Sequence, residues 1–345
     1  MTRSPYLATV RRSLGRSRRG TIAIVASGAI ALLVSIGVAT QLAGDAGRHH
    51  VHVSPAYEHL MQFQALAEEH GDRALGTAGY EAAAEYVEEQ LASAGYETTR
   101  QYFTFERRGE DYESFNVIAQ TPRGDDENVI MLGAHLDGVP GSPAINDNAS
   151  GAAALLEAAR ELSRQDRVNT TVRFVWWGAE EARRSPGSRH YVEELDEDDE
   201  LEHILAYLNF DMVASPNPII GIYDARDTGA SLDIPEGSVE IMRLFADYFD
   251  ARGQPWVATE WDFRSDQVPF AREDVPVGGL FTGSDEPKSG REAALFGGRA
   301  DAPRDPNYHS PGDDIDNVDL QTLDLMTEAI THVAATLAED SSVLE

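Results

Sequence analysis

The chain of 345 residues is long enough for about one to three domains, and its 42% hydrophobic residues suffice for a sizeable core. It contains no cysteine, which excludes a disulfide scaffold, a zinc finger, an iron–sulfur cluster and a cysteine nucleophile, so His, Asp and Glu must hold any bound metal. Its 59 acidic and 28 basic residues give a net charge of −31, which disfavours nucleic acid as a partner.

The balance of charges is typical of two kinds of protein. One is a salt-adapted protein exposed to brine, since acids are abundant and Lys288 is the single lysine. The other is an ordinary acidic secreted protein from a GC-rich genome. The composition leaves both interpretations open.

The N-terminal segment differs from the rest of the chain. Residues 1–44 carry six arginines and no acidic residue, and an uncharged apolar run covers residues 21–43. Such a run can cross a bilayer, which takes about 20 residues, and the basic-then-apolar order places the acidic body outside the cytoplasm. The segment is a cleaved signal peptide or an uncleaved signal-anchor, and its length favours the anchor. We expect a secreted or anchored extracytoplasmic protein that meets the membrane only through residues 21–43.

Residues 45–54 are expected to form a linker, residues 55–340 one domain and residues 341–345 a tail. Helices are predicted within residues 55–98, and strand-like and helix-like segments alternate after them. This alternation is typical of an α/β fold with a mixed, mostly parallel central sheet between helix layers. The predicted strands are Phe115–Ala119, Val129–Gly133, Val172–Trp177, Ile204–Phe210, Ile219–Tyr223 and Val277–Phe281, and the predicted later helices are Ser150–Gln165, Ser238–Phe249 and Leu320–Ala338.

Polar side chains follow several predicted strands, and sites in open α/β sheets form beyond the carboxyl ends of strands. His135 and Asp137 follow one strand, with the spacing of a metal ligand and the carboxylate that orients it. Taken alone, a polar strand terminus explains that pair better. Glu180 and Glu181 follow a buried apolar run, where an unpartnered charge is costly.

Three further residues join these candidates. Asp211 follows another buried strand, Asp147 lies just before a predicted helix, where a simple cap is the alternative, and His309 lies before the last helix. Two histidines and three carboxylates suit zinc. They exceed the needs of one tetrahedral ion, so a pair of ions sharing one carboxylate fits better. The candidate ligands are His135, Asp147, Glu181, Asp211 and His309.

The motifs together resemble those of the co-catalytic zinc aminopeptidases, in order and approximate spacing. From about residue 56 to residue 338 the chain is similar to the compact secreted bacterial leucyl aminopeptidases of peptidase family twenty-eight. The segments that carry the resemblance are Gly76-Thr77-Ala78-Gly79-Tyr80, Gly133-Ala134-His135-Leu136-Asp137, Asn146-Asp147-Asn148, Trp176-Trp177-Gly178-Ala179-Glu180-Glu181, Asn209-Phe210-Asp211-Met212, Arg264-Ser265-Asp266 and Tyr308-His309.

The resemblance implies a role for each site residue. Asp147 would bridge two zinc ions, with His135 and Asp211 completing one ligand set and Glu181 and His309 the other. It implies further that Asp137 holds His135 and that Glu180 is the general base. Tyr308 resembles the donor to the oxyanion, and Arg264 and Phe281 resemble residues that line the substrate site.

Three departures from the family pattern are visible, and one is the absence of the cysteines that flank the Tyr-His motif in some relatives. The family usually has a shorter, apolar, glycine-rich link after the second glutamate, whereas Arg183 and Arg184 stand there in this chain. The rim of the pocket is therefore expected to differ. Gln267 stands where a histidine often follows the Ser-Asp pair.

The expected protein is a monomeric aminopeptidase that removes apolar N-terminal residues from peptides with a free N-terminus. Its reaction would use a water activated by two zinc ions, with Glu180 as base. The alternatives are a carboxypeptidase or a glutaminyl cyclase on the same fold, and a non-catalytic binding ectodomain. A carboxypeptidase needs a basic pocket for the substrate carboxylate, a cyclase usually uses one zinc, and a binding ectodomain typically loses ligands.

Overall fold

The computed structural model describes residues 54–197, 200–226, 233–261 and 264–344. The expected signal or anchor segment, residues 21–43, and nearly all of the expected linker lie outside these ranges. Within them, no helix combines the length and the apolarity that a bilayer crossing requires.

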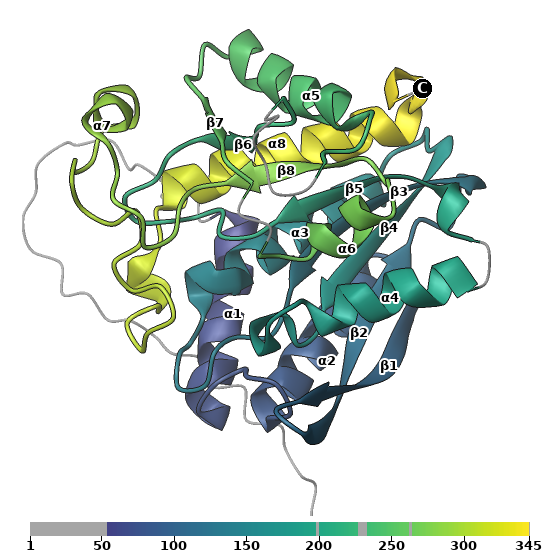
Figure 1. Ribbon diagram of the computed structural model, residues 1–345, viewed down its shortest axis with the longest axis horizontal. Coiled ribbons are helices and arrows are strands. Elements are labelled where there is room, and N and C mark those ends of the chain that lie inside the picture. Colours follow the sequence, from purple (N-terminus) through teal and green to yellow (C-terminus); the bar gives the residue numbers. More distant parts are fainter. Residues whose placement is uncertain (1–53, 198–199, 227–232, 262–263, 345) are drawn as a thin grey trace, which may run out of the picture. The chain divides into compact units, whose positions relative to one another are not determined.

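The described residues form an α/β domain around a mixed eight-stranded sheet with the order β1-β2-β4-β3-β5-β8-β6-β7 (Figure 1). Its central strands β4, β3, β5 and β8 run parallel, whereas β1 and β2 are antiparallel at one edge and β6 is antiparallel to β8. The sheet is thus mixed, as expected, and parallel mainly in its centre. The strands are β1 Thr98–Arg107, β2 Glu110–Gln120, β3 Asp125–His135, β4 Thr170–Trp177, β5 Ile204–Phe210, β6 Gly221–Tyr223, β7 Val257–Thr259 and β8 Val277–Phe281.

Helices cover both faces of the sheet (Figure 1). The larger core lies between one face and five helices, which are α1 Pro55–His70, α2 Ala78–Ser93, α3 Ser150–Leu162, α5 Ser238–Ala251 and α8 Leu320–Glu339. The smaller core lies under α4 Pro186–Glu197 and α6 Gln267–Arg272 on the other face. The short helix α7 Gly290–Phe296 has no buried residue.

Strand β3 shows why the predicted runs are so apolar. Successive side chains of a strand point to opposite faces, and here both faces are covered. Ile130 and Leu132 enter the larger core, while Val129 and Met131 enter the smaller one. A strand buried on both sides needs apolar residues at every position, which is the pattern seen in the sequence.

The sequence analysis did not predict β1, β7, α4, α6 or α7. In β1, polar residues fill most positions and only Phe103 and Phe105 are buried. In α4, acidic residues dominate the exposed side, while Tyr191 and Val192 enter the smaller core. Each element is held in place by a few buried aromatic or aliphatic side chains, which pack against residues from other parts of the chain.

A close approach of α3 to the end of β5 generates the first prediction. A Cβ added at Gly151 would overlap with the carbonyl oxygen of Phe210, whereas one added at Gly290 would meet no atom within 4 Å. We expect Gly151→Ala to lower the free energy of unfolding by about 1–3 kcal/mol, although alanine is the better helix former. Urea denaturation followed by circular dichroism measures this.

Gly290→Ala is the matched control, since this residue is exposed at the first position of α7. It should leave the stability unchanged or raise it by up to about 1 kcal/mol. Equal effects of the two substitutions would contradict the close approach.

Candidate metal centre

The centre lies at the carboxyl ends of the parallel strands β3, β4 and β5, which are neighbours in the sheet. His135 is the last residue of β3, and Asp211 directly follows β5. Glu180 and Glu181 form the start of a 3₁₀ turn, Glu180–Ala182, just after β4. The buried apolar strands therefore bring four polar side chains to one edge of the sheet.

Asp147 reaches the same place from the turn Ile145–Ala149, which lies between β3 and α3. The carboxylate of Asp313 fixes this turn, since it accepts the backbone N–H groups of Asn146 at 2.8 Å and of Asp147 at 3.0 Å. Asp313 belongs to the same loop as His309. The loop that supplies the last histidine therefore also holds the turn that carries Asp147.

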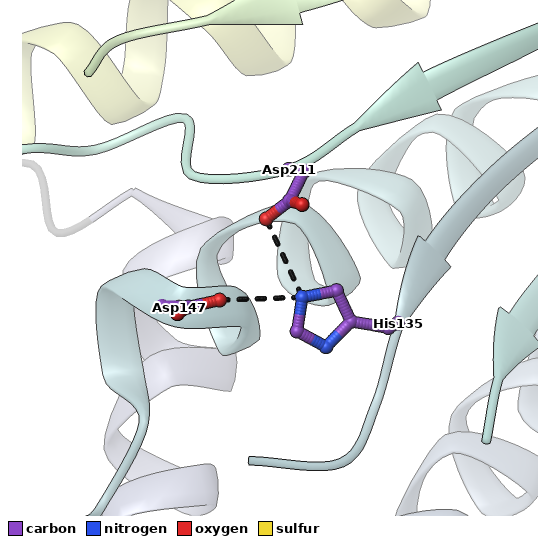
Figure 2. Close-up of side chains that lie close together, drawn as sticks. All are labelled: His135, Asp147 and Asp211. Carbon is purple, nitrogen blue, oxygen red and sulfur yellow. Dashed lines mark ion pairs between the residues drawn. The ribbon is translucent and has the colours of Figure 1, made fainter. Parts of the chain in front are cut away.

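The first group of side chains is His135, Asp147 and Asp211 (Figure 2). Nε2 of His135 lies 3.2 Å from Oδ1 of Asp147 and 3.4 Å from Oδ1 of Asp211. The ligand atoms of the three residues all lie within 4.8 Å of one another, so one small cation could contact all of them.

The second group is Asp147, Glu181 and His309. Nε2 of His309 lies 3.0 Å from Oδ2 of Asp147 and 3.1 Å from Oε2 of Glu181. Asp147 thus directs one carboxylate oxygen to each group. This placement is what a carboxylate shared between two cations requires.

The chemistry of the donors also fits bound cations. Oδ2 of Asp147, Oε1 of Glu181 and Oδ1 of Asp211 are buried and accept no well-aligned hydrogen bond from the described residues, although imidazole nitrogens lie close to two of them. Buried carboxylate oxygens without a partner are costly, and coordination of a metal ion removes that cost. Nitrogen and oxygen donors in two groups of three suit zinc.

The carboxylates strongly perturb the two histidines. Burial alone would lower the pKa of His135, but the charges of Asp211 and Asp147 outweigh burial and raise that pKa well above its usual value. His309 responds in the same way, and its two carboxylate neighbours raise its pKa to about 10. Burial, together with the charge of Asp147, raises the pKa of Glu181 to about 7. The carboxylates therefore give the centre an excess of negative charge, and this charge stabilises any cationic group placed there.

Asp137 lies directly behind the centre and is fully buried. Its carboxylate accepts the backbone N–H groups of Glu180 at 3.0 Å and of Glu181 at 3.2 Å. Nδ1 of His135 lies 3.0 Å from the backbone oxygen of Asp137 and 3.8 Å from its carboxylate Oδ1. The residue therefore connects the ends of β3 and β4, and its closest contact with His135 is through the main chain.

Glu180 lies beside both groups. Burial raises its pKa well above the usual value, and the carboxylates of Asp266 and Asp211 add to the effect. Ser185 Oγ donates a hydrogen bond of 3.3 Å to its Oε1.

Arg73 is a residue that the sequence analysis missed. Its side chain is fully buried and donates to the backbone oxygens of Leu136 at 2.5 Å and of Ala144 at 2.6 Å. Burial lowers the pKa of its guanidinium to about 10, while Asp313, Asp137 and Asp147 oppose that shift, so it stays charged at neutral pH. A single arginine forms no sequence motif. The only hint in the sequence was that Arg73 is an isolated basic residue in a segment with few others.

A cavity of about 1290 Å³ opens over the centre. It reaches Asp147, Glu180, Glu181, Asp211 and His309, and its wall includes the three other predicted site residues Tyr308, Phe281 and Arg264. The rings of Tyr308 and His309 stack with centroids 3.8 Å apart. Every predicted site residue except the buried His135 and Asp137 therefore borders one cavity.

Arg73 generates a prediction about stability. Replacing it by methionine would leave two buried backbone oxygens without this donor and would remove a buried cation that stabilises three carboxylates. We expect Arg73→Met to lower the free energy of unfolding by about 3–5 kcal/mol. Arg243→Met removes an exposed ion pair with Glu240, and as the control it should change stability by less than about 1 kcal/mol. Equal losses in urea denaturation would contradict the role of Arg73.

Comparison with known proteins places the chain in a family. The model of "Peptidase family M28" matches residues 116–334. The "Probable lipoprotein aminopeptidase LpqL" of Mycobacterium tuberculosis is 45% identical over 237 residues, which cover 67% of this chain and 47% of that protein. The chain thus spans about half the length of the curated relatives it matches.

Solved structures share the fold at low sequence identity. The zinc aminopeptidase BSAP of Bacillus subtilis aligns with a TM-score of 0.66 and 17% identity, covering 84% of this chain and 95% of that one. The glutaminyl cyclase of Porphyromonas gingivalis aligns with a TM-score of 0.62 and 19% identity, covering 82% and 97%. The family match covers well over half of the chain, from β2 into α8, and the chain belongs to peptidase family M28.

Proposed function

We propose that this chain is a zinc aminopeptidase that binds two ions. The observation that carries the proposal is the position of Asp147, whose two oxygens point to separate histidine–carboxylate groups. Membership of peptidase family M28 and the name of a 45% identical relative support the same reaction class.

The proposed ligands follow the two groups. His135 and Asp211 hold one zinc ion, Glu181 and His309 hold the other, and Asp147 is shared. Zinc bound there would lower the pKa of a water to about 7 and polarise the substrate carbonyl.

Glu180 is the proposed general base. It borders the cavity beside the ligands, and its raised pKa suits a carboxylate that must hold a proton between two steps. The residue accepts the proton of the attacking water and donates it to the leaving amine. Asp137 positions this glutamate through the backbone N–H groups of the turn.

Tyr308 is the proposed donor to the oxyanion. Burial and the carboxylates of Asp147 and Asp211 raise the pKa of its hydroxyl well above its usual value, so the group keeps its proton at neutral pH. A neutral hydroxyl on the cavity wall can donate a hydrogen bond to negative charge that develops on a carbonyl oxygen.

The substrate is proposed to be a peptide with a free N-terminus. The carboxylates at the cavity floor favour a cationic α-amine. Phe281, Met212 and Tyr223 line the same cavity and favour an apolar N-terminal side chain. Arg264 also borders it, as proposed for a residue of the substrate site.

The location and organisation are proposals as well. Residues 55–340 would form the peptidase domain of a monomer, residues 45–54 a linker and residues 341–345 a tail. Residues 1–44 would export the domain as a cleaved signal or hold it at the membrane as an anchor. The name of the lipoprotein relative supports an extracytoplasmic location.

A second candidate, a carboxypeptidase, is favoured by one observation. Six arginines line the cavity and could bind a terminal carboxylate. The likeness to a glutaminyl cyclase concerns the fold alone.

Hydrolysis of Leu-p-nitroanilide by the full-length protein tests the proposal, before and after chelation and after addition of zinc. N-acetyl-Leu-p-nitroanilide, an N-acetylated peptide with a free C-terminus and a peptide with N-terminal glutamine complete the assay. Zinc-restored cleavage of the free amine alone supports an aminopeptidase. Release of C-terminal residues, or formation of pyroglutamate, would replace it by the carboxypeptidase or the cyclase.

The general base generates a prediction about rate. Glu180→Gln should lower kcat for Leu-p-nitroanilide by about 100- to 10,000-fold, because the amide cannot accept the proton. Bound zinc, measured by atomic absorption, should stay at the wild-type level, since Glu180 belongs to neither ligand group. A rate near that of the wild type would contradict the assignment of the base.

Removal of metal generates a prediction about stability. Chelation should lower Tm, because it leaves buried carboxylates facing one another, and zinc at about 100 times its Kd should restore about 2.7 kcal/mol. Asp147→Asn should abolish this zinc-dependent rise in differential scanning fluorimetry. The exposed Asp166→Asn is the control and should retain it. An unchanged Tm on chelation of a zinc-loaded sample would refute the site.

A further inference from the structure

Arginines are concentrated in the wall of the cavity, although the chain as a whole is strongly acidic. The chain has 28 basic and 59 acidic residues, and six of the basic ones precede residue 45. Of the remaining 22 basic residues, six arginines line this one cavity. Apart from the four carboxylates at the metal centre, Glu193 and Glu273 are the acidic residues in its wall. The arginines are Arg107, Arg183, Arg184, Arg189, Arg264 and Arg272.

The two kinds of charge occupy different depths. Asp147 is buried, and the side chain of Glu181 has a relative exposure of 10%. Arg183, Arg184 and Arg272 are exposed. The carboxylates of the metal centre therefore form the floor of the cavity, and exposed arginines form much of its rim.

Four of these six arginines form no ion pair within the described residues, so their charge is not neutralised by a carboxylate of the protein. Arg189 lies 3.7 Å from Glu193 and Arg264 lies 3.8 Å from Glu286. Arg107, Arg183, Arg184 and Arg272 form no ion pair with any residue in the described ranges. A cation without an internal partner, in a chain with an excess of acids, is open to an anionic group from outside.

The backbone conformation also keeps two of the arginines, Arg183 and Arg184, at the surface. Arg183, Arg184 and Ser185 follow one another with φ values of 72°, 64° and 44°, a left-handed region that non-glycine residues rarely adopt. Ser185 is buried and bonds to Glu180. In the link between Glu180 and α4, Ser185 is therefore held in the interior, whereas Arg183 and Arg184 remain exposed.

We propose that this cavity selects peptides that carry carboxylate side chains beyond their first residue. This inference rests on the proposed aminopeptidase function. An exopeptidase holds the first residue at the floor, and the rest of the peptide must run outward past the rim. Glutamate or aspartate at the second and third positions would then meet the arginines.

The expected size follows from electrostatic attraction at a cleft. Clefts lined by one sign of charge raise the encounter rate of oppositely charged ligands by about 10- to 1,000-fold, and salt weakens this effect. Since the rim charges are exposed and the floor of the same cavity is acidic, the lower end of that range applies. Acidic peptides should therefore have an advantage of about 10-fold in kcat/KM at low salt.

The test uses three peptides with amidated C-termini, Leu-Glu-Glu, Leu-Gln-Gln and Leu-Lys-Lys, and measures release of leucine by the zinc-loaded full-length protein. Amidation removes the terminal carboxylate, so only side-chain charge differs. Leu-Glu-Glu should be cleaved best and Leu-Lys-Lys worst, with a ratio that falls as salt is added. Circular dichroism checks that the protein is folded at each salt concentration.

Variants assign the preference to the rim. The double variant Arg183→Gln, Arg184→Gln should reduce the ratio between the acidic and neutral peptides to about 2-fold or less. The double variant Arg183→Glu, Arg184→Glu should invert the order of the acidic and basic peptides, which a merely damaged enzyme would not do. Arg164→Gln with Arg167→Gln is the control, since it removes two exposed charges near the amino end of β4 and should keep the wild-type ratio.

Equal kcat/KM for the three peptides, or an unchanged ratio in the first double variant, would overturn the inference while leaving the aminopeptidase intact. If no peptide is cleaved, the proposed function fails. Fluorescence anisotropy of the same three peptides, labelled at the C-terminus, then decides the charge preference separately. Tighter binding of the acidic peptide would retain the inference, and equal binding would end it.

Discussion

The excess of carboxylates at one buried edge of the sheet is the constraint on which the rest of the structure depends. Like charges brought together away from water repel one another, so each needs a donor or a cation. Asp137 and Asp313 are satisfied by backbone N–H groups, and Arg73 places a fixed cation behind them. Asp147 and Asp211 keep buried oxygens without such donors. The fold thus separates carboxylates that hold loops from carboxylates that are free to bind ions.

The centre of the fold could be predicted because its strands are buried on both faces. Continuous apolar runs gave β5 and β8 with the bounds that the structure has, and they located the polar residues that follow them. The edge strand β1 could not be found in this way, because only two of its side chains are buried. Its backbone is held in the sheet by pairing with β2. Its extended conformation is fixed by pairing with β2 and not by a pattern of apolar residues in its own sequence.

The same distinction applies to the site. Residues at strand ends stand out because an apolar run stops there, which singled out His135 and Asp211. His309 has no such marker, and it entered the candidate set through its place before the last helix and through the family resemblance. Arg73 belongs to no motif, and its partners are main-chain oxygens more than sixty residues away. Groups that support the centre from behind are defined by three-dimensional packing and leave little trace in a single sequence.

The loop that carries His309 and Asp313 has a consequence for synthesis of the protein. Asp147 is held by Asp313, which lies 166 residues later in the chain. A nascent chain on the ribosome therefore contains β3, β4 and β5 long before it can assemble the second ligand group. Hydrolytic activity by the proposed mechanism is withheld until this late loop has been translated and has docked.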